Sequence, residues 1–330
     1  MSAPARLLAC LLPAVLAGSA CDVAMSADGV EGAFDRELTV TGPLELEVGS
    51  GSGDIIVRTG PAGAVHIRGK VRASTGPFVS FGNQSPTERV RQIEKDPPIE
   101  QSGNRILVGP RRWDGWNGIR ISYEITVPAN TRLDARSGSG DLEVGDVAGP
   151  VDTSTGSGEI KVGRITESVK ARSGSGGIEV DGASSLEAST GSGNVRATSV
   201  RGDLEARSGS GDITLGQKGK GRVDVSTGSG EVEVTGATGP MHVRASSGNI
   251  MVEGTPVSDW DVSASSGDVR LRVAGQTGFD LDLRSSSGRI ETSHPITVSG
   301  SQSRRELKGQ VRGGGPRVHV TTSSGAISIQ

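Results

Sequence analysis

The stretch Ala135–Gly163, "ARSGSGDLEVGDVAGPVDTSTGSGEIKVG", repeats one pattern twice, and this repetition decides the fold. In each copy a Ser-Gly-rich corner is followed by an acidic residue, Asp141 or Glu159, and then by a short alternating apolar segment. Alternation with a period of two is typical of β-strands that bury one face. Glycine at the corner allows backbone conformations that a β-carbon would forbid. The stretch therefore predicts a repeated strand–corner–strand unit.

The corner recurs through most of the chain. Its last glycine stands at Gly53, Gly140, Gly158, Gly176, Gly193, Gly211, Gly230, Gly248, Gly267, Gly288 and Gly325. From Gly140 to Gly267 the steps are 18, 18, 17, 18, 19, 18 and 19 residues. A unit of this size cannot bury its apolar face alone, whereas stacked copies can, which is the principle of a solenoid. We therefore expect an all-β, single-domain parallel β-solenoid (β-helix) with coils of about 18 residues and a narrow core of small side chains.

A second alternation indicates how the units stack. The residue four places before the corner glycine is Arg or Ser in turn: Arg136, Ser154, Arg172, Ser189, Arg207, Ser226, Arg244, Ser263 and Arg284. With one unit per coil, arginines would stand roughly 9.6 Å apart; with two units per coil they would stack at about 4.8 Å and repel. The pattern favours one unit per coil, although duplication of a two-unit block would also produce it.

The N-terminus predicts export. The apolar run "RLLACLLPAVLAG" is typical of a signal peptide over residues 1–20, and small residues precede Cys21. We expect lipidation of Cys21, although Gly18 stands where a lipoprotein signal prefers an aliphatic residue and ordinary cleavage after Ala20 is the alternative. The mature chain would be an extracytoplasmic lipoprotein, held to a membrane in the periplasm or at the cell surface, with one cysteine and no internal disulfide.

Two segments interrupt the rhythm. We expect a tether over 21–32 and a solenoid over 33–330, with an irregular cap at 74–120, regular repeats at 133–290 and an excursion with a closing strand at 294–320. In the cap, "SPTE" from Ser85 is a capping box with proline at the first helical position, which predicts one short helix, Pro86–Lys95. The strand-like segments "NRILV" and "IRISYEITVP" follow.

Composition and motifs exclude several classes of function. Lys and Arg number 35 against 38 Asp and Glu, so no basic field favours nucleic acid. The glycine corners lack the third glycine and the helix start of a phosphate-binding loop. A calcium ladder is disfavoured because Gly177, Asn194 and Arg289 interrupt the acidic position. We therefore predict no metal and no cofactor, and interpret the corners as structural.

Catalysis is not expected either. The four histidines, His66, His242, His294 and His319, lack metal-ligand spacing, and no nucleophile motif is present. A polysaccharide-acting β-helix enzyme, with corner carboxylates as acid and base, remains the unfavoured alternative. The sequence predicts a protein that is not an enzyme.

The segment that does not repeat is the better candidate for binding. "RRWDGWNG" places Trp113 and Trp116 beside Arg111 and Arg112, and exposed aromatic and Arg side chains often anchor partners. The interpretation that we favour over a binding site, however, is that these rings close the open N-terminal end of the solenoid, because solenoids need caps. Trp260 and Phe279 are expected to fill the core.

These features resemble a bacterial family known as a "putative adhesin" domain of unknown function. The resemblance rests on the "SGSGD" and "TGSGE" corners, on "ISYEITVP" at Ile121–Pro128 and on "KGQVRGGGPRVHVTTSSGAISI" at the end, and it covers about Leu38 to Gln330. It implies a β-helical fold, an envelope location and no catalytic residues. We therefore expect an adhesin-like protein that binds an envelope glycan or protein, with a scaffold subunit of an envelope complex as the alternative.

Overall fold

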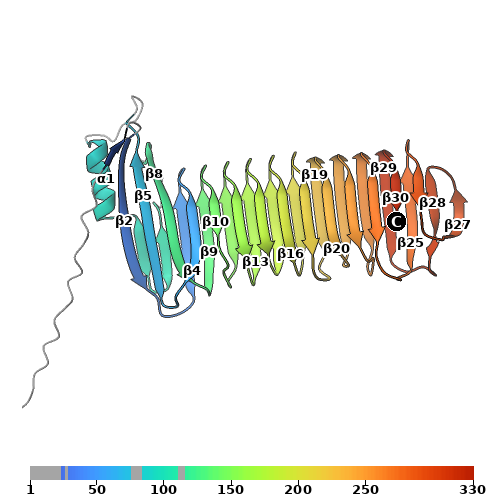
Figure 1. Cartoon of the computed structure of the whole chain (residues 1–330), viewed down its shortest axis with the longest axis horizontal. Coiled ribbons are helices and arrows are strands. Elements are labelled where there is room, and N and C mark those ends of the chain that lie inside the picture. Colours follow the sequence, from blue (N-terminus) through green and yellow to red (C-terminus); the bar gives the residue numbers. More distant parts are fainter. Residues whose placement is uncertain (1–23, 27–28, 76–83, 111–115) are drawn as a thin grey trace, which may run out of the picture.

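The protein is a two-sheet β-solenoid, seen in a computed structural model that describes residues 24–26, 29–75, 84–110 and 116–330. Two long, mostly parallel sheets face each other along a rod, and one helix lies at the N-terminal end (Figure 1). In the described part of the chain each sheet has 15 strands, which at about 4.8 Å per strand gives a rod of roughly 67 Å. The predicted all-β solenoid is confirmed.

The order of strands in space differs from their order in the chain at both ends of each sheet. From the N-terminal end of the rod, sheet A contains β1 (Ala24–Ser26), β2 (Gly29–Thr39), β5 (Ala64–Ala73), β8 (Ile119–Pro128), β4 (Ile55–Gly60), β10 (Leu142–Val144), β12 (Ile160–Arg164), β14 (Ile178–Gly182), β16 (Val195–Val200), β18 (Ile213–Gln217), β20 (Val232–Ala237), β22 (Ile250–Gly254), β24 (Val269–Val273), β30 (Ile327–Ile329) and β26 (Ile290–Thr292). From the same end, sheet B contains β6 (Ile99–Ser102), β7 (Arg105–Val108), β3 (Leu44–Ser50), β9 (Thr131–Ser137), β11 (Val151–Thr155), β13 (Ser168–Ser173), β15 (Ser185–Thr190), β17 (Leu204–Ser208), β19 (Val223–Ser229), β21 (Met241–Ser247), β23 (Trp260–Ser266), β29 (Arg317–Ser324), β25 (Phe279–Ser285), β28 (Glu306–Val311) and β27 (Thr297–Gln302).

One repeat unit makes one coil. Each unit gives one strand to each sheet, and Leu142 pairs with Ile160, which in turn pairs with Ile178. These partners are 18 residues apart, the same step as the corner glycines. Ser154 therefore stands between Arg136 and Arg172 on neighbouring strands, which places the arginines about 9.6 Å apart, as the alternation predicts.

The core between the sheets consists mainly of aligned aliphatic side chains. In β13 only alternate residues are buried, among them Val169 and Ala171, and neighbouring coils repeat the pattern in register. Trp260 and Phe279 are fully buried, as expected for core-filling rings. Because each layer is thin, most of the stability must come from stacking one coil on the next.

The corners are joined by a ladder of buried hydroxyls. The Ser173 hydroxyl donates to the Gly158 carbonyl of the preceding coil at 3.0 Å and accepts from the Gly176 N–H of its own corner at 2.8 Å. The same two bonds are made by Ser137, Thr155, Thr190 and Ser208. Each hydroxyl therefore satisfies two buried backbone groups that the turn would otherwise leave unpaired.

The corner glycines are required for a reason other than the one expected. Among the described residues, Gly176 and most of its counterparts do not have a positive φ; Gly248 (φ 147°) and Gly267 (φ 145°) do. A β-carbon on Gly176 would instead overlap the carbonyl of Gly158 in the adjacent coil. The glycines therefore permit close stacking of the backbone, and the sequence-based explanation by φ alone is wrong for most corners.

The N-terminal end is closed by sheet A and a helix. Helix α1 (Pro86–Lys95) begins at the predicted capping box of Ser85 and Glu88 and buries Val90 and Ile93. It contacts β2 and β5, where sheet A extends beyond the other sheet (Figure 1). The predicted tether 21–32 needs correction, because β1 and β2 already form an antiparallel pair within it. This antiparallel pair was not predicted from the sequence.

The C-terminal coil is inserted between two earlier coils. Strand β29 pairs in parallel with both β23 and β25, and β30 pairs with both β24 and β26. The excursion before it forms the antiparallel pairs of β25 with β28 and of β28 with β27. Arg312 (φ 52°) and Gly313–Gly315 turn the chain back into this position. The closing segment is therefore an internal coil, flanked by the predicted excursion.

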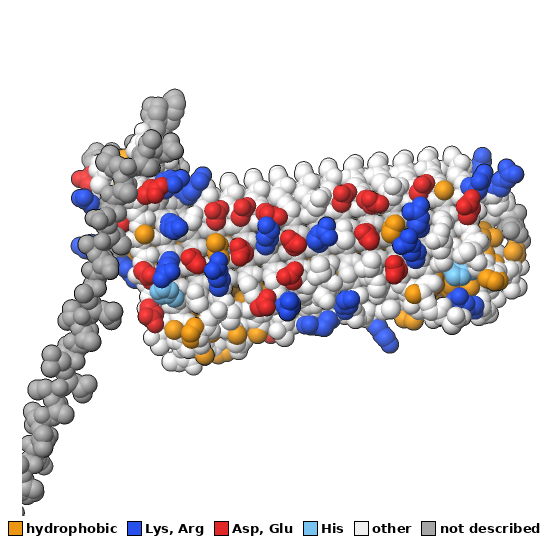
Figure 2. Space-filling view, in the orientation of Figure 1, with side chains coloured by type: hydrophobic (Ala, Val, Ile, Leu, Met, Phe, Trp, Pro, Cys, Tyr) orange, Lys and Arg blue, Asp and Glu red, His pale blue; other side chains and the backbone are white. Residues whose placement is uncertain are grey.

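Charged side chains of both signs lie along the outer surface of the rod. On the face that Figure 2 shows, acidic and basic side chains intermix in rows along the rod. The rows follow from the register, because each outward position is repeated at the same place on the next strand.

Candidate functional site

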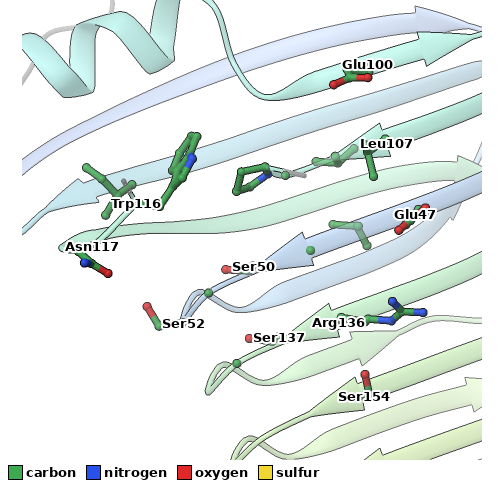
Figure 3. A pocket seen from close by; sticks show the side chains of 18 of the residues that line it. Glu47, Ser50, Ser52, Glu100, Leu107, Trp116, Asn117, Arg136, Ser137 and Ser154 are labelled. Atoms are coloured by element: carbon green, nitrogen blue, oxygen red, sulfur yellow. The ribbon is translucent and has the colours of Figure 1, made fainter. Parts of the chain in front are cut away.

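A groove hollows the outer face of sheet B at its N-terminal end. We call it the N-terminal groove; it has a volume of about 1130 Å³ and is lined by residues from β6, β7, β3, β9 and β11 and from the segment at Trp116–Ile119 (Figure 3). Five adjacent strands form its floor, so the groove is built on a rigid element rather than on a loop.

The floor carries an apolar side chain between two carboxylates. Leu107 faces outward from β7 and pairs in register with Glu47 on β3 and Glu100 on β6. On the next strands the same outward position is occupied by Asp134 and Asp152. Leu107 is therefore an apolar exception in a charged row, and it is only half-buried.

The ends of the strands form the rim of the groove. Ser50, Ser52 and Ser137 belong to the corners, and Trp116 and Asn117 stand opposite them (Figure 3). Trp116 packs partly against the core, and the Arg89 guanidinium of α1 lies 5.1 Å from its ring centroid. These contacts hold the indole in place. Trp116 therefore packs as part of the N-terminal cap and also lines the groove.

The charges of the groove are balanced. Arg105 lies 3.5 Å from Glu47 and 3.9 Å from Glu45, and Arg136 donates to Asp134 at 2.6 Å. Burial raises the pKa of Asp134, and the neighbouring Asp152 and Glu47 carboxylates add to the rise while Arg136 opposes it. The described lining of the groove therefore offers charged hydrogen-bonding groups with little net charge.

The corner carboxylates have a structural use. The Asp141 side chain accepts from the Glu159 N–H of the next coil at 2.8 Å, and Asp212 does the same for Glu231. Such bonds explain why short Asp or Asn side chains recur at this place. No three His, Cys, Asp or Glu side chains in the described part of the chain are arranged to hold a metal ion.

The predicted binding residues are only partly placed. Trp116 lines the groove, whereas Arg111, Arg112 and Trp113 lie outside the described residues, as does Cys21. Leu107, Glu47 and Arg105 were not predicted from the sequence. A signal for Leu107 was present, because "RILV" has three apolar residues in a row where an exposed strand face should alternate.

The comparisons with known proteins identify the family. The chain matches the family described as Toastrack DUF4097 in two overlapping regions, residues 87–222 and 167–330. The chain belongs to this family. The resemblance inferred from the corner motifs is confirmed, and the Toastrack match spans the groove-lining segment from Glu100 onward as well as the regular repeats.

Solved structures similar to this Toastrack chain are distant. A "putative cell adhesion protein" from Clostridium sporogenes is 12% identical, with 90% of this chain and 98% of that chain covered and a TM-score of 0.22. "Putative adhesins" from Bacteroides fragilis and Parabacteroides distasonis are each 11% identical, with 90% and 97% coverage and TM-scores of 0.28 and 0.30. No match was found among curated proteins.

Proposed function

We propose that this Toastrack chain is a non-enzymatic, adhesin-like protein of the cell envelope that binds polysaccharide in the N-terminal groove. The observation that carries the proposal is the composition of the groove, in which Trp116 and Leu107 stand among carboxylate, guanidinium, amide and hydroxyl groups. A sugar ring has apolar C–H faces and a rim of hydroxyls, so it needs both kinds of surface. Binding sites of this kind combine a few apolar contacts with fixed polar groups.

The proposal includes a lipid on Cys21. Only Asp22 and Val23 separate this cysteine from β1, which is the edge strand of sheet A at the capped end. A lipid there would hold the capped end of the rod near the membrane and leave the remaining coils free to reach outward. No described helix is long and apolar enough to cross a membrane.

A binding role, rather than catalysis, is supported by how the acidic residues are used. Asp141 and Asp212 accept hydrogen bonds from the next coil, and Glu47 and Asp134 face arginines. A glycosidase needs two carboxyl groups that flank the bond to be cleaved. We infer that the bound polymer leaves the groove unchanged.

A glycan array tests this function. The secreted chain is expected to bind a group of related polysaccharides, and Trp116→Ala should weaken that binding about tenfold, because buried aromatic anchors dominate such contacts. Trp116→Phe should retain part of the affinity, and Trp113→Ala tests the neighbouring ring. Val257→Ala, at an exposed site far from the groove in sequence, is the control.

Three outcomes would contradict the proposal. The first is equal binding by the parent and by a folded Trp116→Ala variant. The second is the absence of glycan binding together with stable co-purification of one envelope protein, which would favour the scaffold alternative. The third is release of new reducing ends from a bound polysaccharide, which would show that the protein is an enzyme.

A further inference from the structure

A second hollow lies on the same outer face of sheet B. Its volume is about 470 Å³ and it is formed by β13, β15, β17 and β19, the four strands that follow the N-terminal groove. Its charged lining residues are Lys170, Glu187, Glu205, Asp224, Asp203 and Arg222. The two hollows therefore occupy nine consecutive strands of one sheet.

One row of side chains connects the two hollows and contributes lining residues to each. We call it the central row; in register along the sheet it contains Glu100, Leu107, Glu47, Asp134, Asp152, Lys170, Glu187, Glu205 and Asp224. Beside it runs the row of alternating Arg and Ser, in which Arg136 and Ser154 also line the N-terminal groove. The two hollows thus lie on one face of sheet B and are linked by the central row, of which Asp134 and Asp152 line neither hollow.

We propose that the two hollows form one track for a linear, extended, uncharged polysaccharide that lies parallel to the solenoid axis along the central row, from Glu100 to Asp224. This inference rests on the proposed function and extends it by naming the class of ligand and its direction. Nine strands at about 4.8 Å give a track of roughly 38 Å, long enough for several sugars in an extended chain.

The geometry favours a linear polymer because the track repeats. A chain along the axis crosses the strands at right angles and meets one side chain of each row at every strand. An extended peptide would instead pair with a strand at the edge of a sheet, where free backbone groups are available. The track lies on the face of the sheet, and its strands are paired on both sides from β7 to β19.

The charges favour an uncharged polymer. A polyanion would meet Glu187, Glu205 and Asp224 in succession in the central row, and a polycation would meet Arg172 and Arg207 in the row beside it. Ion pairs hold these groups in place: Lys170 lies 2.9 Å from Glu187, and so does Arg172. Sugar hydroxyls can donate to such carboxylates and accept from such cations without disturbing the balance.

Calorimetric titration of the secreted chain with β-1,4-linked N-acetylglucosamine and glucose oligomers of two to eight sugars tests the track. We expect affinity to rise with length until the oligomer fills the track, because each added sugar gains further contacts with the same rigid face. Glu205→Gln should weaken binding of the octasaccharide about fivefold to tenfold, as expected when a charged hydrogen-bond partner is lost, and leave disaccharide binding unchanged. Glu179→Gln, on β14 of sheet A, is the matched control and should change neither.

The outcomes separate this inference from the proposed function. If affinity stops rising at a short oligomer and Glu205→Gln has no effect, the track is wrong while binding in the groove stands. Stronger binding of a polyuronate than of the uncharged oligomers would overturn the assignment of the ligand class. If neither the array nor the titration detects binding to any glycan, the proposed function itself fails.

Discussion

At the scale of single residues, backbone contact between coils determines the corner sequence. Gly176 leaves room for the Gly158 carbonyl, and Ser173 satisfies a donor and an acceptor on two adjacent coils. The repetition of the motif is enough to predict where the chain turns. It does not reveal why glycine is needed, because that depends on how closely the neighbouring coil approaches.

Replacing Gly176 by Ala should therefore destabilise the solenoid. The new β-carbon would push against the backbone of the adjacent coil, and we expect a loss of about 1–3 kcal/mol in the free energy of unfolding, as is typical of overpacking. Ser175→Ala, at the exposed tip of the same corner, should change it by less than about 0.5 kcal/mol. Urea unfolding followed by circular dichroism measures both. Equal stability of the two variants would contradict the role assigned to close stacking.

At the scale of elements, local signals and long-range order differ in how well they can be predicted. Helix α1 follows from a capping box and a proline, which act within one turn. The position of β29 between β23 and β25 does not follow from its sequence, because each coil carries the same alternation and fits many neighbours equally well. Local pattern specifies the coil, whereas the turn at Arg312–Gly315 and the stacking energies specify the order.

The central row also makes the stability of the protein depend on pH, because the carboxylates of Glu47, Asp134 and Asp152 stand opposite one another on adjacent strands. The raised pKa of Asp134 means that the folded protein holds the proton more tightly than the unfolded chain, whose ordinary value is 3.8. Between the ordinary pKa and the raised pKa of Asp134, the folded state binds more protons than the unfolded state. The free energy of unfolding therefore falls as the pH rises through this range.

Asp134→Asn should remove this pH-dependent cost. We expect the variant to match the parent at about pH 3, where Asp134 is protonated in both states, and to become the more stable protein as the pH rises to about 7. Urea unfolding at both pH values checks this, with the exposed Asp181→Asn on β14 as the control. A gain in stability that is the same at both pH values would show that the charge of Asp134 is not the cause.

At the scale of the whole molecule, the regular repeats build the rod. The irregular N-terminal segment contributes β6, β7 and Trp116 to the candidate groove. The repeats predicted the solenoid, and the aromatic segment directed attention to Trp116. The groove and the central row were not predicted, because they arise when β6 and β7 join sheet B beside β3, a pairing between segments about 60 residues apart. Such a surface becomes visible only after the strands are placed in order.

The proposed binding of polysaccharide to the outer face of sheet B can be tested directly by a crystal structure. The purified protein would be crystallised with an eight-sugar β-1,4-linked oligomer. We predict sugar density across the strands of sheet B, starting beside Trp116 and following the central row toward Glu205. Sugar density on sheet A, or at an end of the rod, would contradict the proposed binding face.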